Sequence, residues 1–234
     1  MEYGIPCLPY YSGRKTSIRD ILNVILNVCS ALNKIHAQGY THFDVKPENI
    51  LIVKGKAKLG DFSHCSSYTA GQTYDRTIGT GAYIAPEIMP GGKHTEREDI
   101  YSLGITMYSL LMAGRTPFDF SKRETQRRER EDRIESLFIH PELMDMIKKA
   151  AAFDAKDRYA SCHDLSNDIH SFMEAHEGEM DEEVPTYRMI RFFEQTIPPF
   201  CADTAFETNT SGGFETKNRS FSVSSSFSES KEFT

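Results

Sequence analysis

The chain has 234 residues, of which 39% are hydrophobic and 26% are charged, an ordinary globular mixture with enough apolar residues for one sizeable core. Its formal net charge of −7 argues against nucleic acid as a partner, because binding to phosphates favours a basic surface. The five cysteines follow no Cys-x-x-Cys spacing, which indicates reduced thiols in an intracellular, cytoplasmic location rather than a disulfide framework.

The first predicted element is a long amphipathic helix over residues 17–38. Ser17 followed by Asp20 is typical of a capping box, and Gly39 lies where a helix is expected to end. Apolar residues at helical spacing predict one buried stripe, formed by Ile18, Ile21, Leu22, Ile25, Cys29, Leu32 and Ile35. The most apolar part, residues 21–32, is too short and too polar to span a bilayer, and the N-terminus lacks the features of a secretory signal. We therefore expect no membrane partner.

A short β-hairpin is predicted after this helix. Residues 42–49 form a loop, and 50–53 and 57–59 form two strands joined by a Lys-Gly turn. Asp61 follows the second strand, so the hairpin can hold polar loop residues on a rigid support. Residues 63–84 are rich in Ser, Thr, Tyr and Gly and predict a mobile loop.

The rest of the chain is predicted to be helical and then irregular. Helices are expected at 98–113, 122–137, 141–152 and 161–175, and alternating Arg and Glu indicate that 122–137 is a solvated helix rather than a basic binding patch. These helices are followed by an acidic stretch at 177–183 and a short helix at 187–195. Residues 207–234 are predicted to be a disordered tail, because they have almost no aliphatic residues to bury. The predicted fold class is mainly α with a small β-hairpin region (α+β).

Two motifs carry chemistry. Residues 42–50 read His-Phe-Asp-Val-Lys-Pro-Glu-Asn-Ile, and Asp61-Phe62-Ser63 follows at short spacing. Phosphoryl transfer needs a carboxylate that orients the attacking hydroxyl, a cation for the γ-phosphate, and oxygen ligands for Mg²⁺. Asp44, Lys46, Asn49 and Asp61 offer groups of these kinds within a short stretch of sequence.

These motifs, followed by Ala85-Pro86-Glu87, resemble the C-terminal (large) lobe of a eukaryotic-type Ser/Thr protein kinase. The resemblance implies that Asp44 is the catalytic aspartate and that Lys46 neutralises the γ-phosphate of bound ATP. It also implies that Thr80 bridges these two residues and that Asn49 and Asp61 bind Mg²⁺. The alternative to these roles is that Asp44 only caps a turn and that Lys46 is only a solvated surface lysine. The spacing of Asp44, Lys46 and Asn49 favours the catalytic interpretation.

The same resemblance implies structural roles for four further residues. His42 is a packing and hydrogen-bonding residue rather than a general base, and Asp99 holds the backbone of the catalytic loop. Arg158 pairs with Glu87, and a buried carboxylate needs such a partner. The resemblance covers residues 1–175, which we interpret as a kinase-like catalytic domain, followed by an acidic C-terminal extension (176–206) and a disordered Ser-rich tail (207–234).

Three departures from the family pattern limit what the resemblance implies. Phe43 replaces the arginine that captures a phosphorylated activation loop, and Ser63 replaces a glycine, so we expect backbone strain to restrict movement of the metal loop. No Gly-x-Gly-x-x-Gly and no Val-Ala-x-Lys occurs, so we expect the N-terminal β-rich lobe to be absent.

The sequence therefore predicts a Ser/Thr kinase that transfers the γ-phosphoryl group of MgATP to protein hydroxyls, with ATP and a protein substrate as partners. An upstream segment or a partner would supply the N-terminal lobe. The alternative is a truncated kinase-like scaffold, a pseudokinase that binds proteins without phosphoryl transfer.

Overall fold

A computed structural model describes residues 4–11, 14–67, 73, 79–88, 97–117, 134–136 and 138–188. Its elements in chain order are β1 (Ile5–Pro6), α1 (Cys7–Tyr11), α2 (Ile18–His36), β2 (Tyr40–Thr41), β3 (Ile50–Val53), β4 (Lys56–Leu59), β5 (Ser66–Ser67), α3 (Glu98–Leu111), α5 (Pro141–Ala150) and α6 (Cys162–Ala175). Residues 68–72 and 74–78 of the predicted loop at 63–84, most of the predicted helices at 122–137 and 187–195, and the whole tail lie outside the described residues.

Helix α2 forms where the sequence predicts it, and its N-terminus has the predicted capping box. The Asp20 backbone N–H donates to the Ser17 hydroxyl at 3.2 Å, and the Ser17 N–H donates to the Asp20 carboxylate at 2.9 Å. Two N–H groups that the first turn leaves without helical partners are thereby satisfied. The buried stripe includes Ile21, Ile25 and Leu32, all fully buried.

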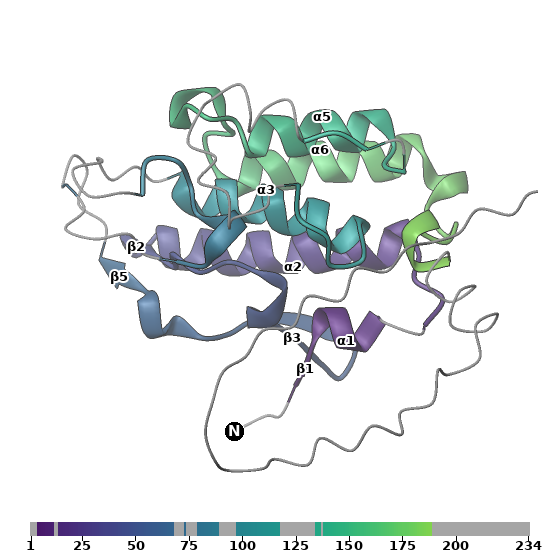
Figure 1. The fold of residues 1–234 in the computed structure, drawn as a ribbon, viewed down its shortest axis with the longest axis horizontal. Helices are drawn as coiled ribbons and strands as arrows, with labels where there is room; N and C mark the ends of the chain where they lie inside the picture. Colours follow the sequence, from purple (N-terminus) through teal and green to yellow (C-terminus); the bar gives the residue numbers. More distant parts are fainter. Residues whose placement is uncertain are drawn as a thin grey trace, which may run out of the picture. The chain divides into compact units, whose positions relative to one another are not determined.

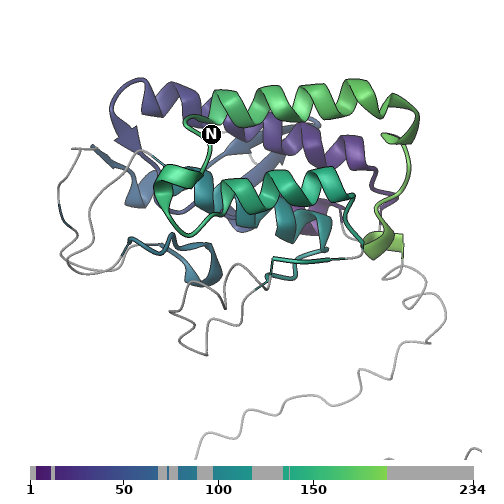
Figure 2. The same ribbon diagram turned by 90° about the horizontal axis from the view of Figure 1, so that it is seen from above.

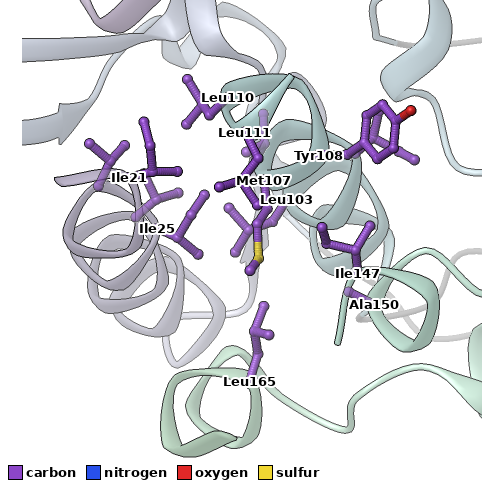
Figure 3. Packing of buried hydrophobic residues seen from close by; sticks show 14 of the residues in the cluster. Ile21, Ile25, Leu103, Met107, Tyr108, Leu110, Leu111, Ile147, Ala150 and Leu165 are labelled. Carbon is purple, nitrogen blue, oxygen red and sulfur yellow. The ribbon is translucent and has the colours of Figure 1, made fainter. Parts of the chain in front are cut away.

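Helix α3 is the centre of the core, because every residue from Glu98 to Leu111 is buried. Figure 3 shows its Leu103 and Met107 facing α2, with Leu165 of α6 below them and Ile147 of α5 on the opposite side of α3. A helix that is buried all round needs neighbours on each face. The described helices supply them: α5 and α6 lie on one side of α2 and α3, and the strands and α1 lie on the other (Figure 1; Figure 2 gives the view from above).

The strands form two small antiparallel sheets. The predicted hairpin is β3–β4, with Ile50 opposite Leu59 and Val53 opposite Lys56, and β1 pairs with the other edge of β3. Lys54 and Gly55 both have positive φ, 50° and 77°, as a two-residue hairpin turn requires. The second sheet, β2 with β5, was not predicted. The fold class is mainly helical with small antiparallel sheets, as the sequence predicts.

The segment after α6 packs on the same core. Met180, Val184 and Tyr187 are buried members of the hydrophobic cluster, and the Val184 N–H donates to the Thr16 carbonyl at 2.9 Å. Arg19, on α2, forms ion pairs with Glu177 and Asp181, both at 2.8 Å. The buried core therefore continues past residue 175, whereas the boundaries predicted for the three segments stay a prediction. In the part of the chain that the structure describes, no helix is long and apolar enough to cross a membrane.

Candidate active site

The loop that contains His42 and Asp44 is held in position by one buried carboxylate of α3. Asp99 is fully buried and accepts the backbone N–H of His42 at 2.8 Å and that of Phe43 at 2.9 Å. Its Oδ2 also lies 2.8 Å from Nε2 of His36, at the end of α2. Hydrogen bonds from backbone N–H groups to a buried carboxylate are strong and directional. Asp99 thus fixes the position of the loop, as the resemblance implies.

Phe43 has an unusual backbone conformation, with φ of 67°, and its side chain is buried in the core. Positive φ is costly for a bulky residue and persists only where the surroundings enforce it. Asp99 enforces it through the Phe43 N–H, and the chain at Gly79 comes close to the Phe43 carbonyl. A Cβ at Gly79 would lie 2.8 Å from that oxygen, and Gly79 itself has φ of 107°, so only glycine fits there.

Three side chains converge on Asp44. The Lys46 ammonium lies 2.8 Å from Oδ2 of Asp44 and donates to the Thr80 hydroxyl at 2.6 Å. That hydroxyl donates in turn to Oδ1 of Asp44 at 2.6 Å. The Asn49 amide donates to Oδ2 at 2.9 Å and to the Asp44 carbonyl at 2.8 Å. Both oxygens of Asp44 are therefore oriented, and Thr80 bridges the two charged residues.

The electrostatics keep Asp44 ionised. Burial alone would raise the pKa of this carboxyl, since it disfavours the charged form, and Asp44 is only 3% exposed. The hydrogen bonds from Lys46, Thr80 and Asn49 outweigh burial and lower the pKa below its ordinary value. A buried carboxylate that stays charged is suited to accept a hydrogen bond from a substrate hydroxyl.

The loop and the hairpin are tied to each other beside this cluster. His42 is fully buried, with Nε2 3.0 Å from the Gly60 carbonyl and Nδ1 accepting the Asp44 N–H at 3.3 Å. The Gly60 N–H donates to the Asn49 carbonyl at 2.8 Å. These contacts agree with a structural role for His42, and they set the distance between Asn49 and the residue that follows Gly60, Asp61.

Asp61 is exposed and adopts a left-handed conformation, with φ of 53°. Its Oδ1 accepts the Ser63 hydroxyl at 2.7 Å and the Ser63 N–H at 3.3 Å, and these two bonds lower the pKa of Asp61. The positive φ is at Asp61, and Ser63 lies in a short 3₁₀ turn, Phe62–His64, so Ser63 is unstrained in this conformation. Ser63 instead holds the Asp61 carboxylate through its hydroxyl. The restriction of metal-loop movement stays a prediction.

The oxygen donors at this edge fit a hard cation. An exposed, ionised carboxylate at Asp61 and the amide oxygen of Asn49, whose nitrogen is committed to Asp44, are the ligand types that Mg²⁺ prefers. The resemblance names both residues as magnesium ligands, and this assignment stays a prediction. The sequence pattern did not identify Ser63 as a partner of Asp61, although a serine two residues after an aspartate in a turn is a recognisable signal for such a bond.

Two hydroxyl groups in α3 also support the site and were missed. Ser102 donates to the Tyr83 carbonyl at 2.7 Å, and Thr106 donates to the Val45 carbonyl at 3.2 Å. One bond holds the segment that contains Thr80, and the other holds the loop that contains Asp44. The available signal was a pair of small hydroxyl residues, spaced by four, in a predominantly apolar helical segment.

Arg158 and Glu87 form a bidentate ion pair, with both N–O distances at 2.7 Å. The Arg158 side chain is fully buried and that of Glu87 is 16% exposed. The remaining Arg158 donors bind the carbonyls of Ala152, Phe153 and Arg97. The pair attaches the segment after Thr80 to the loop before α6.

Comparison with known proteins agrees with this geometry. A family model described as "Protein kinase domain" matches residues 9–176. The chain is similar to serine/threonine-protein kinase PknB of Mycolicibacterium smegmatis, with 34% identity over 69% of this chain and 27% of that protein. It is also similar to PrkC of Bacillus subtilis, with 32% identity over 67% of this chain and 26% of that protein. A third relative, the Wee1-like protein kinase of Arabidopsis thaliana, is 35% identical over 47% of this chain and 22% of its own length. The matches thus span about a quarter of each relative's length.

Proposed function

Because this chain belongs to the protein kinase family, we propose that it transfers the γ-phosphoryl group of ATP to serine or threonine hydroxyls of a protein. The observation that carries the proposal is the network in which Asp44, Lys46 and Thr80 join through contacts of 2.6–2.8 Å. Positioning and charge stabilisation are most of what a kinase contributes to this reaction. The network provides both.

The contacts of Asp44 indicate how an acceptor would be oriented. Oδ2 is held by Lys46 and Asn49, whereas Oδ1 accepts a hydroxyl, that of Thr80, at 2.6 Å. A substrate hydroxyl at the same carboxylate would have its oxygen aligned for attack and its proton directed to Asp44. When bound, MgATP supplies the phosphoryl group and part of the charge neutralisation. Lys46 would meet the transferring group, and Asn49 and Asp61 would hold the magnesium ion.

The proposal also includes the source of the groups that enclose the phosphates of bound ATP. The 234 residues contain no Gly-x-Gly-x-x-Gly and no Val-Ala-x-Lys, so the groups that enclose the α- and β-phosphates come from an upstream segment or a partner. We place the reaction inside the cell, in the cytoplasm, since the described cysteines are free thiols. By themselves the 234 residues should bind MgATP weakly, because an open, wet site positions phosphates poorly.

The test is phosphoryl transfer from radiolabelled ATP to matched peptides that carry Ser, Thr or Tyr at one position. It is run with residues 1–234 and with any natural form that includes upstream coding sequence. The proposal expects transfer to Ser and Thr by the form in which the nucleotide is covered. Transfer to Tyr alone, or MgATP bound tightly without any transfer, would contradict it.

A scaffold without catalysis is the second candidate, favoured by the missing glycine-rich and Val-Ala-x-Lys motifs. Such a protein gains nothing from the bonds that orient Asp44 and keep it ionised. Absence of both MgATP binding and transfer in every form tested, with intact folding, would favour the scaffold.

A further inference from the structure

Two histidines and a glutamate meet outside the candidate active site, where α5 begins and α6 ends. His140 caps the N-terminus of α5, Glu142 lies in its first turn, and His176 caps the C-terminus of α6. One potential ligand atom from each residue lies within 4.8 Å of the others. His140 and His176 are half-buried and Glu142 is exposed.

The orientation of His176 is fixed. Its Nδ1 lies 3.1 Å from the Phe172 carbonyl, and because a carbonyl can only accept, Nδ1 carries the proton of the neutral ring. The ring also stacks on Phe172, with centroids 4.4 Å apart. The lone pair of Nε2 therefore points away from the helix, toward Oε1 of Glu142 at 3.4 Å. A backbone carbonyl that orients the second ring nitrogen is the usual support of a metal-binding histidine.

Two acceptors that face each other repel unless a proton or a metal ion lies between them. We propose that His140, Glu142 and His176 bind a Zn²⁺ ion, with water as the fourth ligand. Tetrahedral Zn²⁺ with bonds of about 2.0–2.1 Å places its ligand atoms roughly 3.3–3.4 Å apart. The 3.4 Å between Nε2 of His176 and Oε1 of Glu142 matches this separation.

His140 has to adjust more than the other two ligands. Its Nδ1 accepts the Glu142 backbone N–H at 3.3 Å, a long hydrogen bond that ligation through this nitrogen would replace. The Glu142 side chain is 56% exposed and can rotate, so an ion can enter from solvent. The partial negative charge at the C-terminus of α6 favours a cation beside His176.

The ion would connect the start of α5 to the end of α6. The segment that follows His176 carries Glu177 and Asp181, which bind Arg19 of α2. Zinc would therefore provide a second attachment for the beginning of this segment, at His176. Because the folded chain binds the ion and the unfolded chain lacks the site, zinc should raise the melting temperature.

The test is a Zn²⁺ titration of the full chain against a chromophoric chelator, with thermal unfolding in parallel. Glu142→Gln and His176→Gln should each lose one bound Zn²⁺, or bind it at least about tenfold more weakly. His170→Gln is the matched control, since His170 is an exposed histidine of the same helix. It should bind zinc and gain melting temperature as the unsubstituted chain does.

Zinc at thiols or at Asp61 would persist in all the variants, so the difference between them isolates the proposed site. Replacing Zn²⁺ by Co²⁺ should give the intense visible absorption of tetrahedral coordination, lost in Glu142→Gln. If His176→Gln fails to fold, Glu142→Gln decides, because this exposed change leaves the ring on Phe172 in place. Equal zinc stoichiometry and affinity in the unsubstituted chain and Glu142→Gln would overturn the proposal and leave a histidine–glutamate ion pair only.

Discussion

Removal of the Glu87 carboxylate should destabilise the fold itself. Arginine has five N–H donors, and in Arg158 all are used: two toward Glu87 and three toward the carbonyls of Ala152, Phe153 and Arg97. Glu87→Ala leaves a fully buried guanidinium charge without its counter-ion. Loss of one partner of a buried pair costs about 3–5 kcal/mol, and the three remaining carbonyls place this case near 3 kcal/mol.

Arg158→Ala should cost more, about 4–5 kcal/mol, since it removes the buried counter-ion of Glu87 and the donors of three carbonyls together. In urea unfolding the double variant should be less damaging than the sum of the single changes, with a coupling of about 1–3 kcal/mol. Glu87→Gln is the control, because it keeps an acceptor for one of the two N–H groups. Strict additivity of the two alanine changes would refute the reasoning, whatever the size of each.

Three further outcomes are expected. The pKa of Asp44 is lower in the folded chain than its value of 3.8 in the unfolded chain, so the ionised carboxylate stabilises the fold at pH values above 3.8. This stabilisation is lost as the pH falls through the pKa of the folded chain. The gap in unfolding free energy between the unsubstituted chain and Asp44→Asn should therefore narrow below about pH 4 in urea melts at several pH values, and a constant gap would contradict this. Ending the chain after residue 176 should lower the free energy of unfolding by several kcal/mol, because the burial of Met180, Val184 and Tyr187, each worth about 1.5–3 kcal/mol, is lost. An equal urea midpoint for chains that end at residues 176 and 188 would argue against this. Activity should survive phosphatase treatment, since Phe43 is buried and offers no cation to a phosphorylated Thr69, Thr73 or Thr77, and a collapse of turnover would point to another basic residue.

The long elements were predictable because their signals are local. Helix α2 is specified by its apolar period and by Ser17 and Asp20, and the β3–β4 hairpin by its Lys-Gly turn. Two-residue strands such as β1 and β2 carry no period, and their pairing depends on partners far along the chain. Sequence patterns therefore could not predict them.

In the candidate active site, too, some features follow from local sequence and others depend on residues far apart in the chain. Asp44, Lys46, Asn49 and Asp61 follow from one short motif pair, whereas the positive φ of Phe43 depends on Asp99 and Gly79, which are remote in sequence. The segment from 177 was read as an acidic extension because its charges dominate its composition. Met180, Val184 and Tyr187 nevertheless recur at a helical spacing of four and three, and that signal was available.

The most direct test of the account is the rate of phosphoryl transfer by Asp44→Asn, in whichever natural form of the chain is active. The change is nearly isosteric and removes the charge that orients the acceptor hydroxyl. Turnover should fall by about 10²–10⁴-fold, while unfolding and circular dichroism show a folded protein. Turnover equal to that of the unsubstituted chain would contradict the central claim that Asp44 orients the acceptor hydroxyl.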